Sequence, residues 1–99
     1  MNHYILFMHN DVPSERRRPA NEWETYFSQL RELGAFQGGS AIGDGLCVSK
    51  SSQSVDITRQ LSGYIRIRAA SLEAARQMVV GNPVYEAGGT VEVRELPKT

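Results

Sequence analysis

One stretch of the chain, residues 61–96, constrains the fold more than any other part of the sequence. Apolar and polar residues alternate over 64–68 and again over 90–94, which is typical of strands with one buried face. Between them, residues 72–79 carry apolar side chains at helical spacing, and Ser71 is placed to cap such a helix. The stretch therefore predicts a strand, a short amphipathic helix and a second strand.

The amino-terminal third of the chain predicts one more strand and one more helix. Residues 3–9 are apolar on both faces, which is typical of a strand in the interior of a sheet. Asn21 can cap a helix whose apolar residues recur every three or four positions. That helix is expected to end at Gly34, because glycine readily adopts the left-handed conformation of a C-cap.

The middle of the chain completes the predicted sheet. Residues 35–42 form a weaker strand pattern, and the pair Gly38 and Gly39 predicts a bulge or a close backbone approach. Residues 46–48 are placed to pair back as a short hairpin arm, and residues 50–58 are expected to form a loop.

The predicted order of elements is β-α-β-β-α-β, which is the split pattern of ferredoxin-like α+β domains. Right-handed crossovers would place both helices on one face of an antiparallel sheet. The other face would then be open, so we expect a homodimer that closes face to face.

Length, charge and cysteine content limit the classes of function. The 99 residues are expected to form a single domain, 1–99, and the net charge of zero offers no field that attracts nucleic acid or anionic lipid. Cys47 is the only cysteine, and neither it nor the two histidines show the spacing of metal ligands. The sequence shows no signal peptide and no membrane span. We therefore expect a cytoplasmic protein without metal, cofactor, nucleic-acid partner or membrane partner.

His9 and Asp11 are the candidate catalytic residues. In an extended segment they project to the same side, about 6.5 to 7 Å apart. A carboxylate that is hydrogen-bonded to an imidazole fixes the tautomer of the ring and makes it a usable general base. The alternative interpretation is a histidine at a strand end followed by an ordinary turn aspartate.

The open face of the predicted sheet supplies the candidate ligand-binding residues. Alternation places Tyr64, Arg66 and Arg94 on this face, while their apolar neighbours face the helices. Guanidinium groups hold carboxylates and phosphates with forked hydrogen bonds, so these residues could bind a small anionic ligand. The alternative is that the arginines form cross-strand or intersubunit ion pairs with Glu92.

Several segments of the sequence resemble the YCII-related family, which consists of small bacterial proteins of the dimeric α/β-barrel type. The similarity runs through YILFMHND, EWETYFSQLRELGAF, LSGYIRIRAASLEAARQM and, most specifically, NPVYEAGGTVEVREL. The last segment is most similar to the branch that also carries a DGPF motif. The corresponding region of this chain, residues 51–64, reads SSQSVDITRQLSGY and lacks that motif.

The resemblance implies a dimeric α/β barrel with a paired Asp and His facing a cleft. Asp11 matches the Asp of the family, whereas the first helix has no histidine and places Trp23 or Tyr26 at that position. The resemblance favours a small-molecule-binding protein, acting as a cofactor-free lyase or isomerase in a cleft on the sheet face. Two alternatives stay open: a non-catalytic dimeric structural or regulatory module, and a cofactor-independent oxygenase on the same type of barrel.

Overall fold

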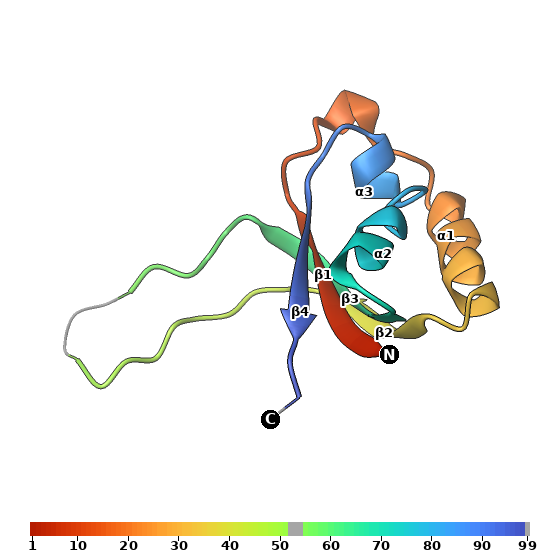
Figure 1. The fold of residues 1–99 in the computed structure, drawn as a ribbon. Helices are drawn as coiled ribbons and strands as arrows, with labels where there is room; N and C mark the ends of the chain where they lie inside the picture. Colours follow the sequence, from red (N-terminus) through yellow and green to blue (C-terminus); the bar gives the residue numbers. More distant parts are fainter. Residues whose placement is uncertain (52–54, 99) are drawn as a thin grey trace.

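The computed structural model describes residues 1–51 and 55–98 (Figure 1). Its elements are, in chain order, β1 (Asn2–His9), the short 3-10 helix η1 (Ser14–Arg16), α1 (Asn21–Glu32), β2 (Phe36–Ala41), β3 (Leu61–Ala69), α2 (Leu72–Gln77), α3 (Pro83–Glu86) and β4 (Val91–Leu96). The strands form one antiparallel sheet in the order β2-β3-β1-β4. The predicted ferredoxin-like pattern is confirmed, with β1 in the interior of the sheet. The short helix α3 lies in what the sequence predicted to be a plain connection.

The core lies between the sheet and the helices α1, α2 and α3, which cover the same face (Figure 1). Tyr4, Leu6 and Met8 of β1 are buried against this layer, while the residues between them are only half-buried. Ile65 and Ile67 of β3 are also fully buried there, as the alternation predicted. One face of the sheet therefore forms the core, and the other is left open by the helices.

The predicted helix ends are partly confirmed. Gly34, which follows the C-cap residue Leu33 of α1, has φ 68°, and the Ser71 hydroxyl accepts a hydrogen bond from the Ala74 N–H at 3.1 Å. The predicted cap at Asn21 is wrong, because Asn21 is already helical and Ala20 occupies the cap position. The turn before α1 supplies backbone carbonyls to the first helical N–H groups, so a side-chain cap is not required there.

Both structural roles expected for Gly38 and Gly39 occur in β2. The register with β3 shifts between Phe36 and Gly38, and Gly38 adopts φ 121°. A Cβ at Gly39 would lie 2.6 Å from the Tyr64 carbonyl oxygen, which is too close for any side chain. The two glycines therefore allow β2 to bulge and still pack closely on β3.

Residues 42–51 and 55–60 leave the sheet as the two limbs of a long arm that points away from the helices (Figure 1). The strand predicted at 46–48 is wrong, since no strand forms within 42–51 or 55–60, and residues 52–54 lie outside the described residues. The two limbs still run side by side, because the Cys47 thiol donates to the Asp56 carbonyl at 3.6 Å and Ile57 lies against Gly45. Alternation alone does not form a strand where no third strand or core is beside it.

Candidate functional site

Both predicted ligand-binding arginines lie on the open face, one on each side of the same residue of β1. Ile5 of β1 pairs with Arg66 of β3 on one side and with Arg94 of β4 on the other. Because neighbouring strands are about 4.8 Å apart, the Cα atoms of the two arginines stand about 10 Å apart. Arg66 donates one hydrogen bond, at 2.9 Å, to the Gln37 carbonyl in the bulge of β2. A guanidinium carries five N–H donors, so this bond leaves donors available to an anion.

Two positions further along β1, the predicted Tyr64 and an acidic residue lie on opposite sides of the same residue. Phe7 of β1 pairs with Tyr64 on one side and with Glu92 on the other. Arg94 donates to one carboxylate oxygen of Glu92 at 3.2 Å, along β4 and not across strands. An ion pair with Glu92 was the alternative interpretation of the arginines, and Arg94 forms one. The Arg94 side chain is 67% exposed, so this pair contributes little to stability and can exchange for a ligand.

His9 lies at the end of β1 and binds Glu92. The distance between its Nε2 atom and the second carboxylate oxygen of Glu92 is 2.9 Å. The hydrogen bond from His9, followed by that from Arg94, lowers the pKa of Glu92 below its ordinary value. An ionised Glu92 that accepts a proton from Nε2 leaves the lone pair of the neutral ring on Nδ1. The arrangement therefore presents a histidine base oriented by a carboxylate.

Asp11 is close to His9 but is not hydrogen-bonded to it. Its carboxylate accepts hydrogen bonds from the Thr90 N–H at 3.0 Å and from the Thr90 hydroxyl at 2.6 Å. These bonds lower the pKa of Asp11, and the nearby His9 adds a smaller effect in the same direction. The expected His9–Asp11 hydrogen bond assumed an extended chain, whereas β1 ends at His9 and its register with β3 shifts between Met8 and His9.

A cavity of about 280 Å³ opens beside His9 at this end of the sheet. Arg17, Arg18, Trp23 and Ser62 are among the residues that line it. The volume lies just below the lower end of the usual range for ligand sites, about 300 Å³, so it suits only a small molecule. Sequence reasoning missed Arg17 and Arg18 as lining residues. Their position could have been inferred from the short loop after β1, because this loop has to pass over the end of the sheet to reach α1.

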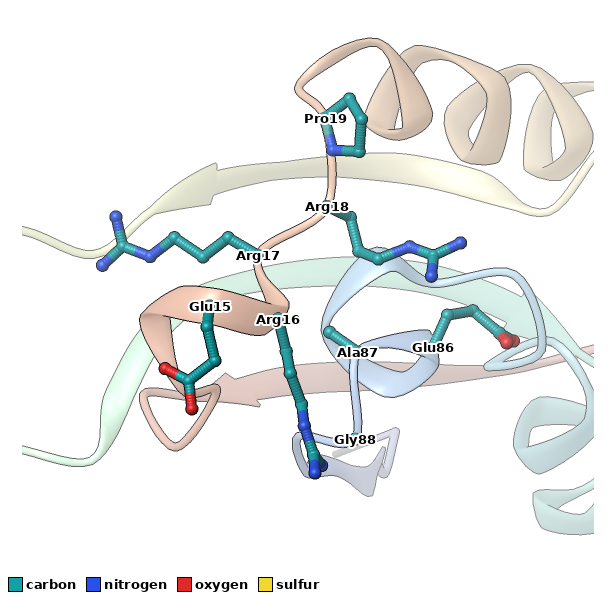
Figure 2. A pocket seen from close by; sticks show the side chains of 8 residues that line it. All are labelled: Glu15, Arg16, Arg17, Arg18, Pro19, Glu86, Ala87 and Gly88. Carbon is teal, nitrogen blue, oxygen red and sulfur yellow. The ribbon is translucent and has the colours of Figure 1, made fainter.

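The run Arg16, Arg17 and Arg18 also borders a second hollow, of about 480 Å³. Figure 2 shows the three guanidinium groups pointing in different directions from the loop. Arg18 is bound through its Nε atom to the Glu22 carboxylate at 2.8 Å. Because the three groups do not converge, this hollow has no geometry for holding a single anion.

Two further observations bear on the class of protein. Within residues 1–51 and 55–98, no group of three or more His, Cys, Asp or Glu side chains could hold a metal ion. None of the helices in the same part of the chain is long and apolar enough to cross a membrane.

The fold is that of a ferredoxin-like α+β domain. One solved structure with this fold is the 5-chloro-2-hydroxyhydroquinone dehydrochlorinase from Burkholderia phenoliruptrix AC1100, in complex with 2,5-dihydroxybenzoquinone. The two chains share 16% sequence identity with a TM-score of 0.60, over 98% of this chain and 95% of the dehydrochlorinase. A comparison with protein-family models gave no match, and a search of the curated proteins gave none. The likeness therefore shows the fold alone.

Proposed function

We propose that this chain is a YCII-like small-molecule-binding protein that works as a cofactor-free lyase or isomerase. The hydrogen bond of 2.9 Å between His9 and Glu92, beside a cavity of about 280 Å³, carries this proposal. A histidine held by an ionised carboxylate is suited to removing a proton from carbon near neutral pH. The dehydrochlorinase supports the proposal as an example of this fold holding a small cyclic ligand.

In the proposed reaction, Nδ1 of His9 removes a proton from a carbon next to a carbonyl group of the substrate. The electron pair of the broken C–H bond moves to the carbonyl oxygen, and Arg94, which shares the Glu92 carboxylate with His9, stabilises the negative charge. Glu92 stabilises the imidazolium that forms. An isomerase would return the proton to another carbon, whereas a lyase would expel a leaving group together with its bonding electrons. The substrate class is therefore a small, anionic carbon acid.

The remaining predicted residues have supporting roles in this proposal. Tyr64 lies on the open face, across Phe7 from Glu92, and can donate a hydrogen bond to the ligand. Asp11 keeps the end of β1 in place through its two hydrogen bonds to Thr90 and does not take the proton. A second copy of the chain, docked on the open face, would close the cleft and exclude water from it.

Hydrogen exchange tests the proposal even while the natural product of the reaction is unidentified. The protein is incubated in D₂O with a set of small enolisable carboxylates and hydroxyquinones, and loss of C–H signals is followed by proton NMR. We expect exchange with at least one compound, and a loss of about a hundredfold or more in His9→Gln. His3→Gln is the matched control, because His3 lies on the same strand and is exposed. Equal rates in the wild type and His9→Gln would rule out His9 as the base.

A non-catalytic dimeric module is the second candidate function. The Arg66–Gln37 and Arg94–Glu92 hydrogen bonds favour it, because they give both arginines a structural partner within the chain. In that case no small anion would bind the wild type, and substitution of either arginine would change stability or assembly only.

A further inference from the structure

One cavity that the proposed mechanism does not use lies between α1 and the strands β2 and β3. Its volume is about 400 Å³, which falls within the usual range for ligand sites, about 300 to 1,000 Å³. We call this cavity the aromatic pocket. The lining residues that matter for its chemistry are Met8, Trp23, Phe27, Gly39, Ala41 and Gly63. Aromatic rings therefore form one side of the pocket, and very small residues form the other.

Two aromatic rings of α1 form one wall of the aromatic pocket. The ring centroids of Trp23 and Phe27 are 5.7 Å apart and the ring planes are inclined by 32°, so the two rings present a broad, gently angled apolar surface. Phe27 also lies against Phe36, with ring centroids 5.3 Å apart, which holds Phe27 in place. Trp23 and Phe27 are only half-buried although both are large and apolar. They therefore keep ring surface available to a ligand.

The opposite wall consists of strand backbone with very small side chains. Ile65 faces the helices, so Gly63 and its partner Ala41 on β2 face them too. Gly63 lacks the positive φ that would favour glycine, and a Cβ there would first meet the flexible end of the Met8 side chain and the Ser40 carbonyl oxygen, both at 3.2 Å. A glycine inside a strand weakens the strand, and it often marks the place where another group approaches the backbone. Gly63 therefore leaves bare backbone facing the aromatic pocket.

The shape of the aromatic pocket favours a flat ligand. A planar ring can lie against the rings of Trp23 and Phe27 on one side and against the backbone at Gly63 on the other, so it gains contacts on both faces. A branched or puckered group is thicker and would force the two walls apart. The aromatic pocket also meets the cavity beside His9, because Trp23 and Ser62 border both. A ligand held at His9 can therefore extend into the aromatic pocket.

We propose that the aromatic pocket binds a planar aromatic ring, and that this ring is part of the substrate on which His9 acts. The substrate is then an aryl-substituted carbon acid, with its ring beside Trp23 and its acidic C–H group near His9. The binding of the ring follows from the geometry of the pocket alone. The assignment of the ring to a substrate of His9 rests on the proposed function.

The first test measures binding through the fluorescence of Trp23, which is the only tryptophan of the chain. The probes are phenylacetate, cyclohexylacetate and acetate, which share a carboxylate and differ in the presence and the planarity of a ring. We expect phenylacetate to bind the wild type at least about tenfold more tightly than acetate does, because only phenylacetate buries an apolar ring that fits the pocket. Cyclohexylacetate is at least as apolar, so its weaker binding would report the flat shape of the pocket. Equal affinities for the three probes, or a preference for cyclohexylacetate, would overturn the proposal.

A variant that fills the aromatic pocket tests where the ring binds. Ala41→Leu places a larger side chain on the helix side of β2, next to Gly63, and should weaken the binding of phenylacetate at least about tenfold. Ala70→Leu is the matched control, because Ala70 is exposed and follows the other end of β3. An unchanged far-UV circular dichroism spectrum shows that each variant is folded. A folded Ala41→Leu that binds phenylacetate as the wild type does would refute the site.

A second measurement locates the ring on the wild type and does not depend on the stability of any variant. Phenylacetate is titrated into the ¹⁵N-labelled chain, and the backbone and indole N–H signals are followed by NMR. We expect the largest shifts at the Trp23 indole N–H and at the Gly63 amide, because an aromatic ring strongly changes the magnetic field of the groups next to it. Shifts confined to the apolar groove around Leu72 and Tyr85 would refute the aromatic pocket as the site.

The ring site and the proposed function can fail separately. In the D₂O assay, phenylpyruvate and pyruvate are compared after correction for exchange without protein, and we expect the protein to accelerate exchange more with phenylpyruvate. Phenylacetate bound in the aromatic pocket, without exchange of any compound, would retain the ring site and remove the lyase or isomerase. Exchange that depends on His9 but is equally fast with both acids, in a chain that does not bind phenylacetate, would retain His9 as the base and overturn the ring site.

Discussion

The Asp11 carboxylate accepts hydrogen bonds from both the backbone N–H and the hydroxyl of Thr90, which lies 79 positions further along the chain. Asp11 follows the interior strand β1, and Thr90 precedes the edge strand β4. The pair therefore joins the loops at one end of the sheet, next to His9. It gives Asp11 a structural role beside the proposed base.

Asp11→Asn should lower the stability at neutral pH, because an amide oxygen replaces only one of the two acceptors of the carboxylate. The pKa of Asp11 is lowered from 3.8 by the bonds to Thr90. Its contribution is therefore fully present above pH 3.8 and is lost as the pH falls through the lower pKa of the folded state. Urea unfolding should show a difference between variant and wild type at neutral pH that shrinks in acid. Thr90→Val, which keeps the backbone donor, should have a smaller effect, and a difference that grew in acid would contradict the assignment.

Glu92 should titrate below 4.5 in the wild type, mainly because of its hydrogen bond to His9 and secondly because of Arg94. Carboxyl ¹³C NMR can measure this pKa directly. We expect His9→Ala to raise the pKa of Glu92 more than Arg94→Ala does. The reverse order would mean that Arg94, and not His9, is the principal partner of this carboxylate.

Arg66→Ala and Arg94→Ala should each weaken the binding of a small carboxylate or phosphate ligand by at least about tenfold, because a hydrogen bond to a charged group contributes about 1.5 to 3 kcal/mol. Calorimetric titration of the ligand checks the affinity, and the melting temperature checks the fold. Arg76→Ala is a suitable control, since Arg76 lies on α2 and pairs with Glu73 at the surface. If no anion binds the wild type and Arg66→Ala instead lowers the melting temperature, the arginines are structural.

Tyr26 should make the fold sensitive to alkali. Burial raises its pKa from 10.0 to about 12, and its hydroxyl donates to the Met78 carbonyl at 2.7 Å. A raised pKa favours the folded state below pH 10.0, and this advantage disappears as the pH rises to about 12. Tyr26→Phe should lose about 1 kcal/mol at neutral pH and show a weaker decline in stability above pH 10.0. Tyr85→Phe, at a half-exposed tyrosine, should leave that decline as it is in the wild type.

Local patterns in the sequence predicted the parts of the fold that depend on neighbouring residues. Alternation placed Ile65 and Ile67 toward the helices, because successive side chains of any strand point to opposite faces. The caps at Ser71 and Gly34 were predictable for the same reason, since each involves one residue and the turn beside it. The same alternation placed Tyr64, Arg66 and Arg94 on the open face, while their role in binding stays a prediction.

Only the tertiary structure decided which side chain lies beside His9. The sequence suggested Asp11, two positions away, whereas the register of β1 with β4 brings in Glu92 from 83 positions away and commits Asp11 to Thr90. The conformation of residues 46–48 was also decided by the tertiary structure. Their alternating pattern forms no strand, because the arm has no sheet beside it. Strand pairing and long-range hydrogen bonds depend on which segments meet in space, and a local pattern carries no information about its distant partner.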